Sequence, residues 1–240
     1  MRRERRRFIV RLAAALVSGA LARTGATQIA TSDTGLETGY VEFGGGVRSY
    51  VARPRAAAAK LRTLIVLHGE RGLDAHVEDV ARRAARGGFA AIAPDLSSAR
   101  GDGPISRLLA LTDEVAARAE SGTLGCVGFS SGGTLALQLA ARRDNIAGAV
   151  AFYAPVPPVL EVPRIKARVL LHFAENDPEI NTSVPAYEAA LNAAGVQNAI
   201  HVYQGTGHDF HDDSVAARHQ AEAAALAWSR TLAFLKDALP

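Results

Sequence analysis

The chain has 240 residues, of which 48% are hydrophobic, and this is enough to build one α/β domain around a sizeable core. Its formal charge of +3 comes from residues 1–22, which carry six arginines and one glutamate, so the near-neutral remainder gives no indication of nucleic-acid binding. A single cysteine, Cys126, excludes an intrachain disulfide and a multi-cysteine metal site. Its place within an apolar run predicts a buried thiol.

The N-terminal 22 residues have the pattern of an export signal. An arginine-rich start precedes the apolar stretch Leu12–Val17, and Ala20–Ala22 forms an A-x-A cleavage motif. Arg5–Ile9 fits the twin-arginine pattern R-R-x-F-[L/I]. The twin-arginine motif predicts export to the periplasm. Because the apolar stretch is too short to span a bilayer, we predict no stable membrane association after signal removal. The mature protein would begin with a flexible lead over 23–38. The alternative is a basic amphipathic helix on a membrane surface.

Residues 39–240 alternate between short apolar runs and segments with helical spacing. The expected strands are Tyr40–Phe43, Val47–Ala52, Thr63–Leu67, Phe89–Ala93, Leu124–Phe129, Ile146–Tyr153, Arg168–Phe173 and Ala199–Tyr203. The expected helices are Asp74–Arg86, Ile105–Glu120, Thr134–Ala141, Val184–Ala194 and Val215–Ala238. The first two strands flank three glycines and predict a hairpin at a sheet edge. The alternation predicts one α/β domain with a mostly parallel, doubly wound sheet flanked by helices, and ligand sites at the carboxyl ends of its strands.

The segment Gly128–Gly132 fits the nucleophile-elbow motif G-x-S-x-G between an expected strand and an expected helix. A sharp turn strains the backbone at Ser130, so the neighbouring residues must be small enough for strand and helix to approach closely. Backbone N–H groups at the helix N-terminus can then stabilise an oxyanion near the serine hydroxyl. The alternative is a glycine-rich turn that only joins a strand to a helix.

Ser130, Asp177 and His208 follow three different expected strands, in the chain order serine, acid, histidine. Serine needs an adjacent base to act as a nucleophile, so His208 would accept its proton and later return it to the leaving group. Asp177 would orient the imidazole and stabilise its charged form. Taken singly, Asp177 could be a turn residue before Pro178, and His208 could be an ordinary loop histidine.

The remaining histidines are expected to be structural. His172 lies within a strand and predicts a packed core residue, while His76, His201 and His219 are expected at the surface. The stretch His208–Asp212 (H-D-F-H-D) could be a metal cluster, but no helical H-x-x-x-H spacing or cysteine supports it. We therefore expect no metal and no organic cofactor.

Two backbone N–H groups are expected to form the oxyanion hole. One belongs to Ser131, and the second belongs to the loop after Leu67, where Gly69 and Glu70 are the candidates and Glu70 is preferred. The side chain of Glu70 could enter the pocket, but we favour a solvated loop acid paired with Arg71.

With these motifs in place, the chain resembles the dienelactone hydrolase family of the α/β-hydrolase superfamily over roughly residues 38–239. The resemblance rests on the stretches His68–Arg83, Gly88–Leu96, Val127–Gly133, Ala174–Gly195, Tyr203–Asp213 and Ala225–Leu235. It implies an α/β-hydrolase fold without a large lid domain, a small-molecule ester or lactone as substrate, and a catalytic set at Ser130, Asp177 and His208.

The chain departs from the family pattern at the nucleophile. The family usually has a cysteine, matched here by Ser130, and a glutamate three residues before a loop glycine that helps to control the thiol. Since that glycine is Gly72, the matching position is Gly69, and Glu70 lies one residue later. Loss of both features is self-consistent, because a serine enzyme has no thiolate to regulate.

The chain also departs from the family at the substrate carboxylate. Arginines bind this group in the type enzyme, but the position four residues after the catalytic histidine is Asp212 here, and Arg100 is displaced by one residue from the second arginine. The resemblance therefore implies an ester or lactone hydrolase more strongly than a dienelactone hydrolase. Candidate substrate-binding residues are Gly69, Glu70, Arg71 and Arg100.

The sequence thus predicts an exported serine hydrolase that cleaves a carboxylic ester or lactone through an acyl-enzyme. The loops at 97–104 and 154–164 are short, which favours a modest or soluble substrate over a long lipid. One alternative is a non-catalytic small-molecule-binding protein on the same scaffold. Another is a different acyl-transfer enzyme, such as a peptidase or an acyltransferase.

Overall fold

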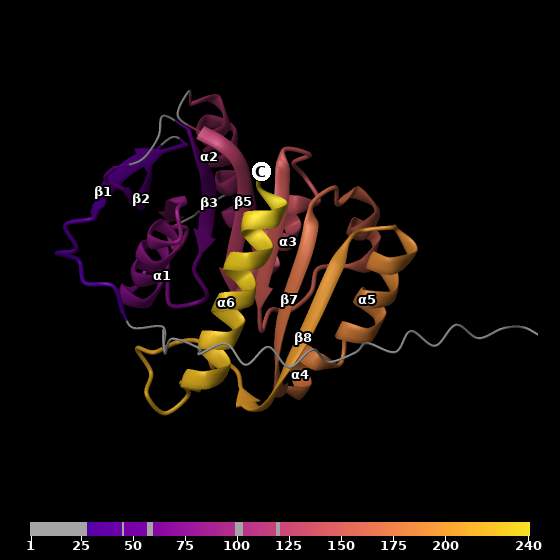
Figure 1. Ribbon diagram of the computed structural model, residues 1–240. Coiled ribbons are helices and arrows are strands. Elements are labelled where there is room, and N and C mark those ends of the chain that lie inside the picture. Colours follow the sequence, from indigo (N-terminus) through magenta and orange to yellow (C-terminus); the bar gives the residue numbers. More distant parts are fainter. Residues whose placement is uncertain (1–27, 45, 57–59, 99–102, 119–120) are drawn as a thin grey trace, which may run out of the picture.

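A computed structural model describes residues 28–44, 46–56, 60–98, 103–118 and 121–240. Eight strands form one sheet in the order β1-β2-β4-β3-β5-β6-β7-β8 (Figure 1). Their bounds are β1 Leu36–Phe43, β2 Val47–Pro54, β3 Leu61–Leu67, β4 Ala90–Pro94, β5 Ser121–Phe129, β6 Ile146–Phe152, β7 Arg168–Asn176 and β8 Asn198–Gly207. β2 pairs antiparallel with β1 and β4, and all other neighbours are parallel. The predicted mostly parallel sheet and its edge hairpin are confirmed.

Helices cover both faces of the sheet, as Figure 1 shows. Their bounds are α1 Ala75–Arg86, α2 Gly103–Ala117, α3 Ser131–Ala140, α4 Pro178–Asn181, α5 Val184–Ala193 and α6 Ala221–Ala238, with the 3₁₀ helix η1 at Val159–Arg164. One buried cluster joins α1 and α6 to one face, and a second joins α2, α3 and α5 to the other. The predicted doubly wound architecture is therefore confirmed. Among the described residues, no helix combines the length and apolar character needed to cross a bilayer.

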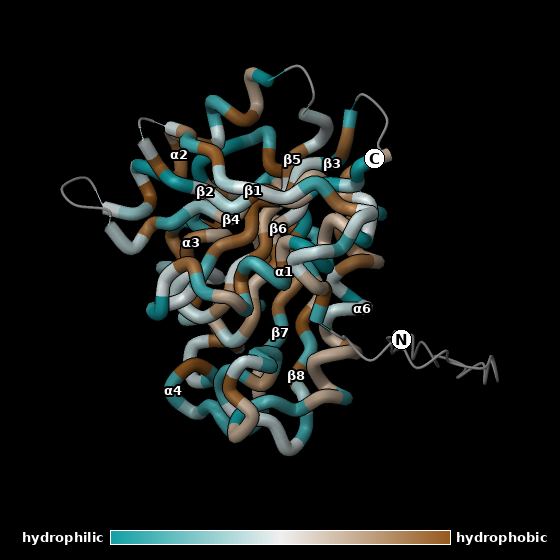
Figure 2. Tube along the Cα trace, turned by 90° about the vertical axis from the view of Figure 1, so that its left-hand side faces the viewer, coloured by the Kyte–Doolittle hydropathy of each residue, from teal (hydrophilic) through white to brown (hydrophobic). Residues whose placement is uncertain are grey.

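The central strands are apolar on both faces because helices cover both. Leu64–Leu67 of β3 are fully buried, as are Val127 of β5, Val150 of β6 and Leu171 of β7. Figure 2 shows these hydrophobic segments gathered along the middle of the molecule, with hydrophilic segments around them. Cys126 lies in the same core, where burial raises the pKa of its thiol to about 12. The thiol is therefore a packing group, as predicted.

The first strand begins earlier than the sequence predicts. The export signal and the first part of the expected flexible lead, residues 1–27, lie outside the described residues. Residues 36–38, also expected in the lead, are part of β1, because the hairpin register continues to Leu36 opposite Pro54. Ile29 is held on α1, where its N–H donates to Asp79 Oδ1 at 2.6 Å and its carbonyl accepts from Arg82 Nε at 2.6 Å.

The closing helix begins later than the sequence predicts. α6 starts at Ala221 and not at Val215. The intervening residues turn back onto the loop after β8: Arg218 Nη1 lies 2.7 Å from Asp209 Oδ2, and the N–H of Gln220 donates to the Phe210 carbonyl at 2.9 Å. These contacts replace the helical hydrogen bonds that continuous periodicity would require.

Candidate active site

Ser130 lies at the sharp turn between β5 and α3, and its backbone is strained. Its φ of 50° and ψ of −124° are values that a residue with a side chain rarely adopts. The turn closes because the flanking residues lack side chains. A Cβ at Gly128 would lie 2.1 Å from the carbonyl oxygen of Gly132, and a Cβ at Gly132 would lie 2.4 Å from that of Leu67. The strand–turn–helix geometry expected for the motif is therefore present.

Three predicted side chains meet at the carboxyl edge of the sheet. The register of β7 and β8 places Asn176 beside Gly207, so the next residues, Asp177 and His208, leave the sheet side by side. Ser130 Oγ lies 3.0 Å from His208 Nε2, and His208 Nδ1 lies 2.6 Å from Asp177 Oδ2. Ser130 and Asp177 are buried, while the His208 side chain is 34% exposed. A hydroxyl, a base and an acid thus form one hydrogen-bonded chain that is open to solvent at the base.

Tyr153 forms a wall beside this chain of side chains. It follows β6 directly, and its φ of 36° is a strained value for an aromatic residue. Its ring centroid lies 4.9 Å from that of His208. Burial raises the pKa of its phenol well above the usual value, so the hydroxyl stays neutral and can donate a hydrogen bond. Tyr153, Phe129, Ser130 and His208 line one cavity of about 510 Å³.

The side chain of Glu70 is exposed to solvent, as expected, but it contacts the site, whereas Arg71 pairs with Asp74, Asp209 and Asp212. Ser130 Oγ lies 3.2 Å from Glu70 Oε1, and the backbone N–H of Ser131 donates to the same oxygen at 3.3 Å. Burial would raise the pKa of Glu70, but hydrogen bonds from its own backbone N–H and from Ser131 and Ser130 outweigh burial and lower the pKa.

The position of Glu70 bears on both expectations about this loop. Its carboxylate takes up the two backbone N–H groups, of Glu70 and Ser131, that are expected to hold an oxyanion. An acidic side chain also touches Ser130, although the sequence suggests that a serine at this position makes such a group unnecessary. The loop after β3 lies close to the turn that carries Ser130, and Gly69 helps to make this possible. A Cβ at Gly69 would lie only 3.2 Å from the Phe129 carbonyl oxygen.

Arg71 lines the same cavity but contacts other carboxylates. Its Nε lies 3.2 Å from Asp74 Oδ2, its Nη1 lies 3.7 Å from Asp209 Oδ2, and its Nη2 pairs with Asp212. The fourth candidate for substrate binding, Arg100, lies outside the described residues.

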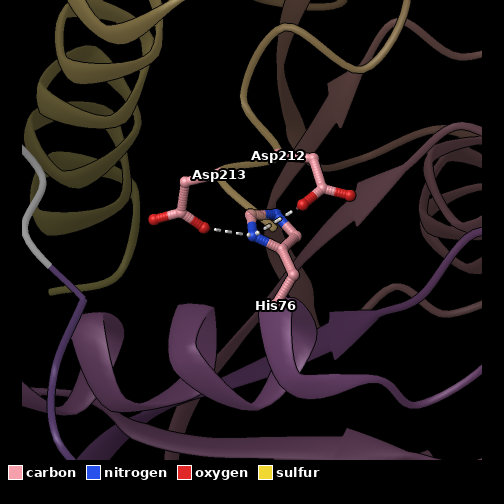
Figure 3. A group of neighbouring side chains, drawn as sticks. All are labelled: His76, Asp212 and Asp213. Atoms are coloured by element: carbon pink, nitrogen blue, oxygen red, sulfur yellow. Dashed lines mark hydrogen bonds and ion pairs between the residues drawn. The ribbon is translucent and has the colours of Figure 1, made fainter. Parts of the chain in front are cut away.

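A buried charged group ties α1 to the loop after β8. His76 Nδ1 lies 3.1 Å from Asp213 Oδ1 and 3.5 Å from Asp212 Oδ1 (Figure 3). Guanidinium groups already face both carboxylates, since Arg71 contacts Asp212 and Arg83 contacts Asp213. A cation bound by these three residues would lie beside two arginines, so the group fits an ion-pair network better than a metal site.

This group corrects the expectation that His76 lies at the surface, because its side chain is only 3% exposed. The sequence did contain a signal: His76, Val80 and Arg83 recur at helical spacing on the stripe of α1 that faces the core. The prediction for His172 is confirmed, since it is fully buried between Thr231 and Tyr203. His201 and His219 are partly buried.

Two further cavities differ in their relation to the site. One of about 440 Å³ shares Gly69 and Glu70 with the first cavity, and its other walls include Leu96, Leu135 and Thr134. Glu70 thus lies between a charged cavity and a more apolar one. Another, of about 330 Å³, lies at the β1–β4 end of the sheet and includes none of the three predicted catalytic residues.

Comparison with known proteins decides the family. The model of the dienelactone hydrolase family matches residues 47–104 and 97–239. The chain belongs to the dienelactone hydrolase family. A Salmonella typhi protein assigned as a carboxymethylenebutenolidase is 31% identical over 242 residues, which cover 86% of this chain and 89% of that protein. A Bradyrhizobium protein assigned as a 2-oxo-3-(5-oxofuran-2-ylidene)propanoate lactonase is 29% identical over 78% of this chain and 88% of its own length.

The solved structures agree with this family. A Klebsiella pneumoniae protein described as a dienelactone hydrolase superimposes with a TM-score of 0.77 at 27% identity, covering 84% of this chain and 98% of the other. The fold is therefore the α/β-hydrolase fold, as predicted. Membership in the dienelactone hydrolase family makes the chain a hydrolase of the ester and lactone class.

Proposed function

We propose that this member of the dienelactone hydrolase family is a serine hydrolase that cleaves a carboxylic ester or lactone through an acyl-enzyme on Ser130. The observation that carries the proposal is the continuous chain from Ser130 Oγ to His208 Nε2, at 3.0 Å, and from His208 Nδ1 to Asp177 Oδ2, at 2.6 Å. Both distances allow direct proton transfer or hydrogen bonding. The three residues come from loops at one edge of the sheet, where ligands bind in this class of fold.

Each residue has a defined part in the proposed reaction. Ser130 Oγ attacks the substrate carbonyl carbon while His208 accepts the hydroxyl proton, and the alcohol then leaves with that proton. Water attacks the acyl-enzyme, its proton passes through His208 to Ser130, and the carboxylic acid is released. Asp177 keeps the imidazole oriented and stabilises its charged form. The N–H groups of Ser131 and Glu70 stabilise the negative charge on the carbonyl oxygen.

The proposed reaction requires the Glu70 side chain to move. Its carboxylate holds the N–H of Ser131 and its own N–H, and these are the donors that the substrate carbonyl oxygen needs. Substrate binding therefore includes exchange of the carboxylate for the carbonyl oxygen. The cavities of about 510 and 440 Å³ on the two sides of Glu70 give space for the two parts of a modest, soluble ester.

A fluorophosphonate probe tests this proposal, because such probes modify serines only when a base activates them. Peptide mass mapping should find one adduct, on Ser130, in the wild-type protein and none in Ser130→Ala or His208→Ala. His201→Ala, which removes a partly buried histidine outside the cavity, is the matched control and should be labelled normally. A folded wild-type protein that takes up no label would contradict the proposal and favour a ligand-binding role. A substrate panel would separate an esterase from a peptidase or an acyltransferase.

We further propose that residues 1–22 direct export through the twin-arginine route, as the motif at Arg5–Ile9 predicts. That route carries folded proteins, and a domain with one cysteine and no disulfide is compatible with it.

A further inference from the structure

The cavity beside Ser130 has strongly charged walls in which negative charge is in excess. Its charged side chains, the histidines apart, are four carboxylates and two guanidinium groups, so the carboxylates outnumber the guanidinium groups by two. These six residues are Glu70, Arg71, Asp74, Asp209, Asp212 and Arg218. A concave site with walls of one predominant sign concentrates the field at the position where a ligand binds.

Both guanidinium groups of the cavity already pair with carboxylates of the protein. Arg71 faces three carboxylates, at 3.2 Å from Asp74, at 3.7 Å from Asp209 and in direct contact with Asp212. The Nη1 atom of Arg218 lies 2.7 Å from Asp209 Oδ2. A substrate carboxylate at Arg71 would compete with three carboxylates of the protein, and one at Arg218 would approach the carboxylate of Asp209.

Two of these carboxylates, Glu70 and Asp209, lie beside the proposed reacting side chains, and Asp212 lies deeper in the wall. Asp209 Oδ1 lies 3.9 Å from His208 Nε2, and its side chain is 15% exposed. Asp212 is almost fully buried between Arg71 and His76, and Figure 3 shows its carboxylate beside the imidazole. The rings of Tyr153 and Phe129 line the same cavity. Carboxylates combined with aromatic walls are the surroundings that an organic cation prefers.

We propose that this cavity selects esters whose alcohol portion carries a positive charge, accepts neutral ones less well, and rejects those that carry a carboxylate. The proposal rests on the proposed function, because it describes the substrate class of the same site. It sets this chain apart from the anionic lactone named for the Bradyrhizobium relative.

Three acetyl thioesters of similar size test the order of preference: acetylthiocholine, its neutral isostere 3,3-dimethylbutyl thioacetate, and the acetyl thioester of 4-mercaptobutanoate. All release a thiol that a colorimetric thiol reagent detects, and the fully buried Cys126 does not interfere. We expect kcat/KM to fall from the cation to the neutral ester to the anion, with about a tenfold difference or more between the two extremes. The ratio should shrink as salt is added, since salt screens charges.

Asp209→Asn gives the matched electrostatic variant. Asparagine keeps the shape of the side chain and tolerates the φ of 64° at this position. The variant should reduce the cation-to-anion ratio several-fold, and any effect on His208 is common to all three thioesters and cancels in the ratio. Asp113→Asn removes an exposed carboxylate that pairs with Arg143 on α2, outside the cavity, and should leave the ratio unchanged.

The outcomes separate this proposal from the proposed function. Equal or faster hydrolysis of the anion, or a ratio that neither salt nor Asp209→Asn changes, would overturn the charge selection while leaving the serine hydrolase intact. If no thioester is hydrolysed, the rates at which cationic, neutral and anionic fluorophosphonates modify Ser130 give the same comparison. Absence of any modification of Ser130 in folded protein would overturn both proposals.

Discussion

Ser130 has one hydroxyl proton and two acceptors within reach. Its Oγ lies 3.0 Å from His208 Nε2 and 3.2 Å from Glu70 Oε1, and one proton can be donated to only one of them. Glu70 therefore competes with the proposed base for the proton of the proposed nucleophile. The same carboxylate also occupies the N–H of Ser131. In this arrangement Glu70 stabilises the resting site and opposes the first step of the reaction.

Replacing Glu70 by glutamine should therefore raise kcat/KM. The amide keeps the size of the side chain but accepts weaker hydrogen bonds than a carboxylate, and a difference of about 1 kcal/mol corresponds to about fivefold. Steady-state kinetics on a neutral ester measure this change, with Glu179→Gln on α4 as the control. A fall of tenfold or more would show that the carboxylate takes part in the reaction.

The pH profile gives an independent check on this assignment. Partial desolvation would raise the pKa of Glu70, but hydrogen bonds lower it, so the group stays ionised throughout the range in which hydrolysis is measured. The kcat/KM profile of the wild type should therefore contain no ionisation that is missing from Glu70→Gln, whereas a parallel displacement of the whole acid limb reflects the charge removed near His208. An additional ionisation in the wild type that is absent from the variant would mean that Glu70 itself titrates during catalysis.

At the scale of elements, the joint between β5 and α3 depends on residues without side chains. We expect Gly128→Ala to lower the free energy of unfolding by about 2–4 kcal/mol, because its Cβ would lie 2.1 Å from the Gly132 carbonyl oxygen and the turn must open. Urea unfolding measures the change. Gly39→Ala on β1 is the control, since its Cβ meets nothing within 4 Å and its stability should change by less than about 1 kcal/mol. Equal effects at both positions would contradict the tight-turn argument.

The ion pairs between α1 and the loop after β8 hold the segment that follows His208. Burial would raise the pKa of Asp213, but the hydrogen bond from His76 and the charge of Arg83 outweigh burial and lower the pKa. A carboxyl group with a depressed pKa in the folded state stabilises the fold above its unfolded pKa, and this stability is lost as the pH falls through the folded value.

Asp213→Asn should accordingly lower the free energy of unfolding at pH 7 by about 1–3 kcal/mol. The deficit should shrink as the pH falls below about 4, where the wild type begins to lose the same contribution. Urea titrations at pH 7 and below pH 4 measure both effects. Asp237→Asn removes a carboxylate that is 73% exposed and pairs with Arg168, so it should cost less than about 1 kcal/mol. A deficit that does not depend on pH would assign the loss to packing instead of charge.

Some features of the site could be predicted from the sequence, and others could not. Ser130, Asp177 and His208 could be placed together because strand ends are readable from apolar runs, and parallel strands end at one edge. The direction of the Glu70 side chain could not be read, because it depends on where the N–H groups of a distant turn lie. The late start of α6 could not be predicted either, because it also depends on a contact with another segment. The residues near Arg218 keep helical periodicity, but Arg218 binds Asp209 in the loop after β8.

At the scale of the whole molecule, charge is divided unevenly along the sequence. The pI of about 9.3 reflects the arginines of residues 1–22, and the remainder carries slightly more acidic than basic residues. The cavity beside Ser130 repeats this acidic bias locally. The basic residues of this segment are those that the proposed export signal requires.

The proposed export signal can be tested by substitutions in its arginine motif. In a bacterium with the twin-arginine route, the double substitution of Arg5 and Arg6 by lysine should retain the protein in the cytoplasm, because the route reads the paired arginines and not their charge. Lysines at Arg2 and Arg3 make the same chemical change outside the motif and should leave export intact. Fractionation with an esterase assay locates the protein, and N-terminal mass analysis of the exported form should show cleavage after Ala22. If the two double variants distribute alike, the arginine-rich segment does not work through this motif, and its affinity for membrane surfaces becomes the better explanation.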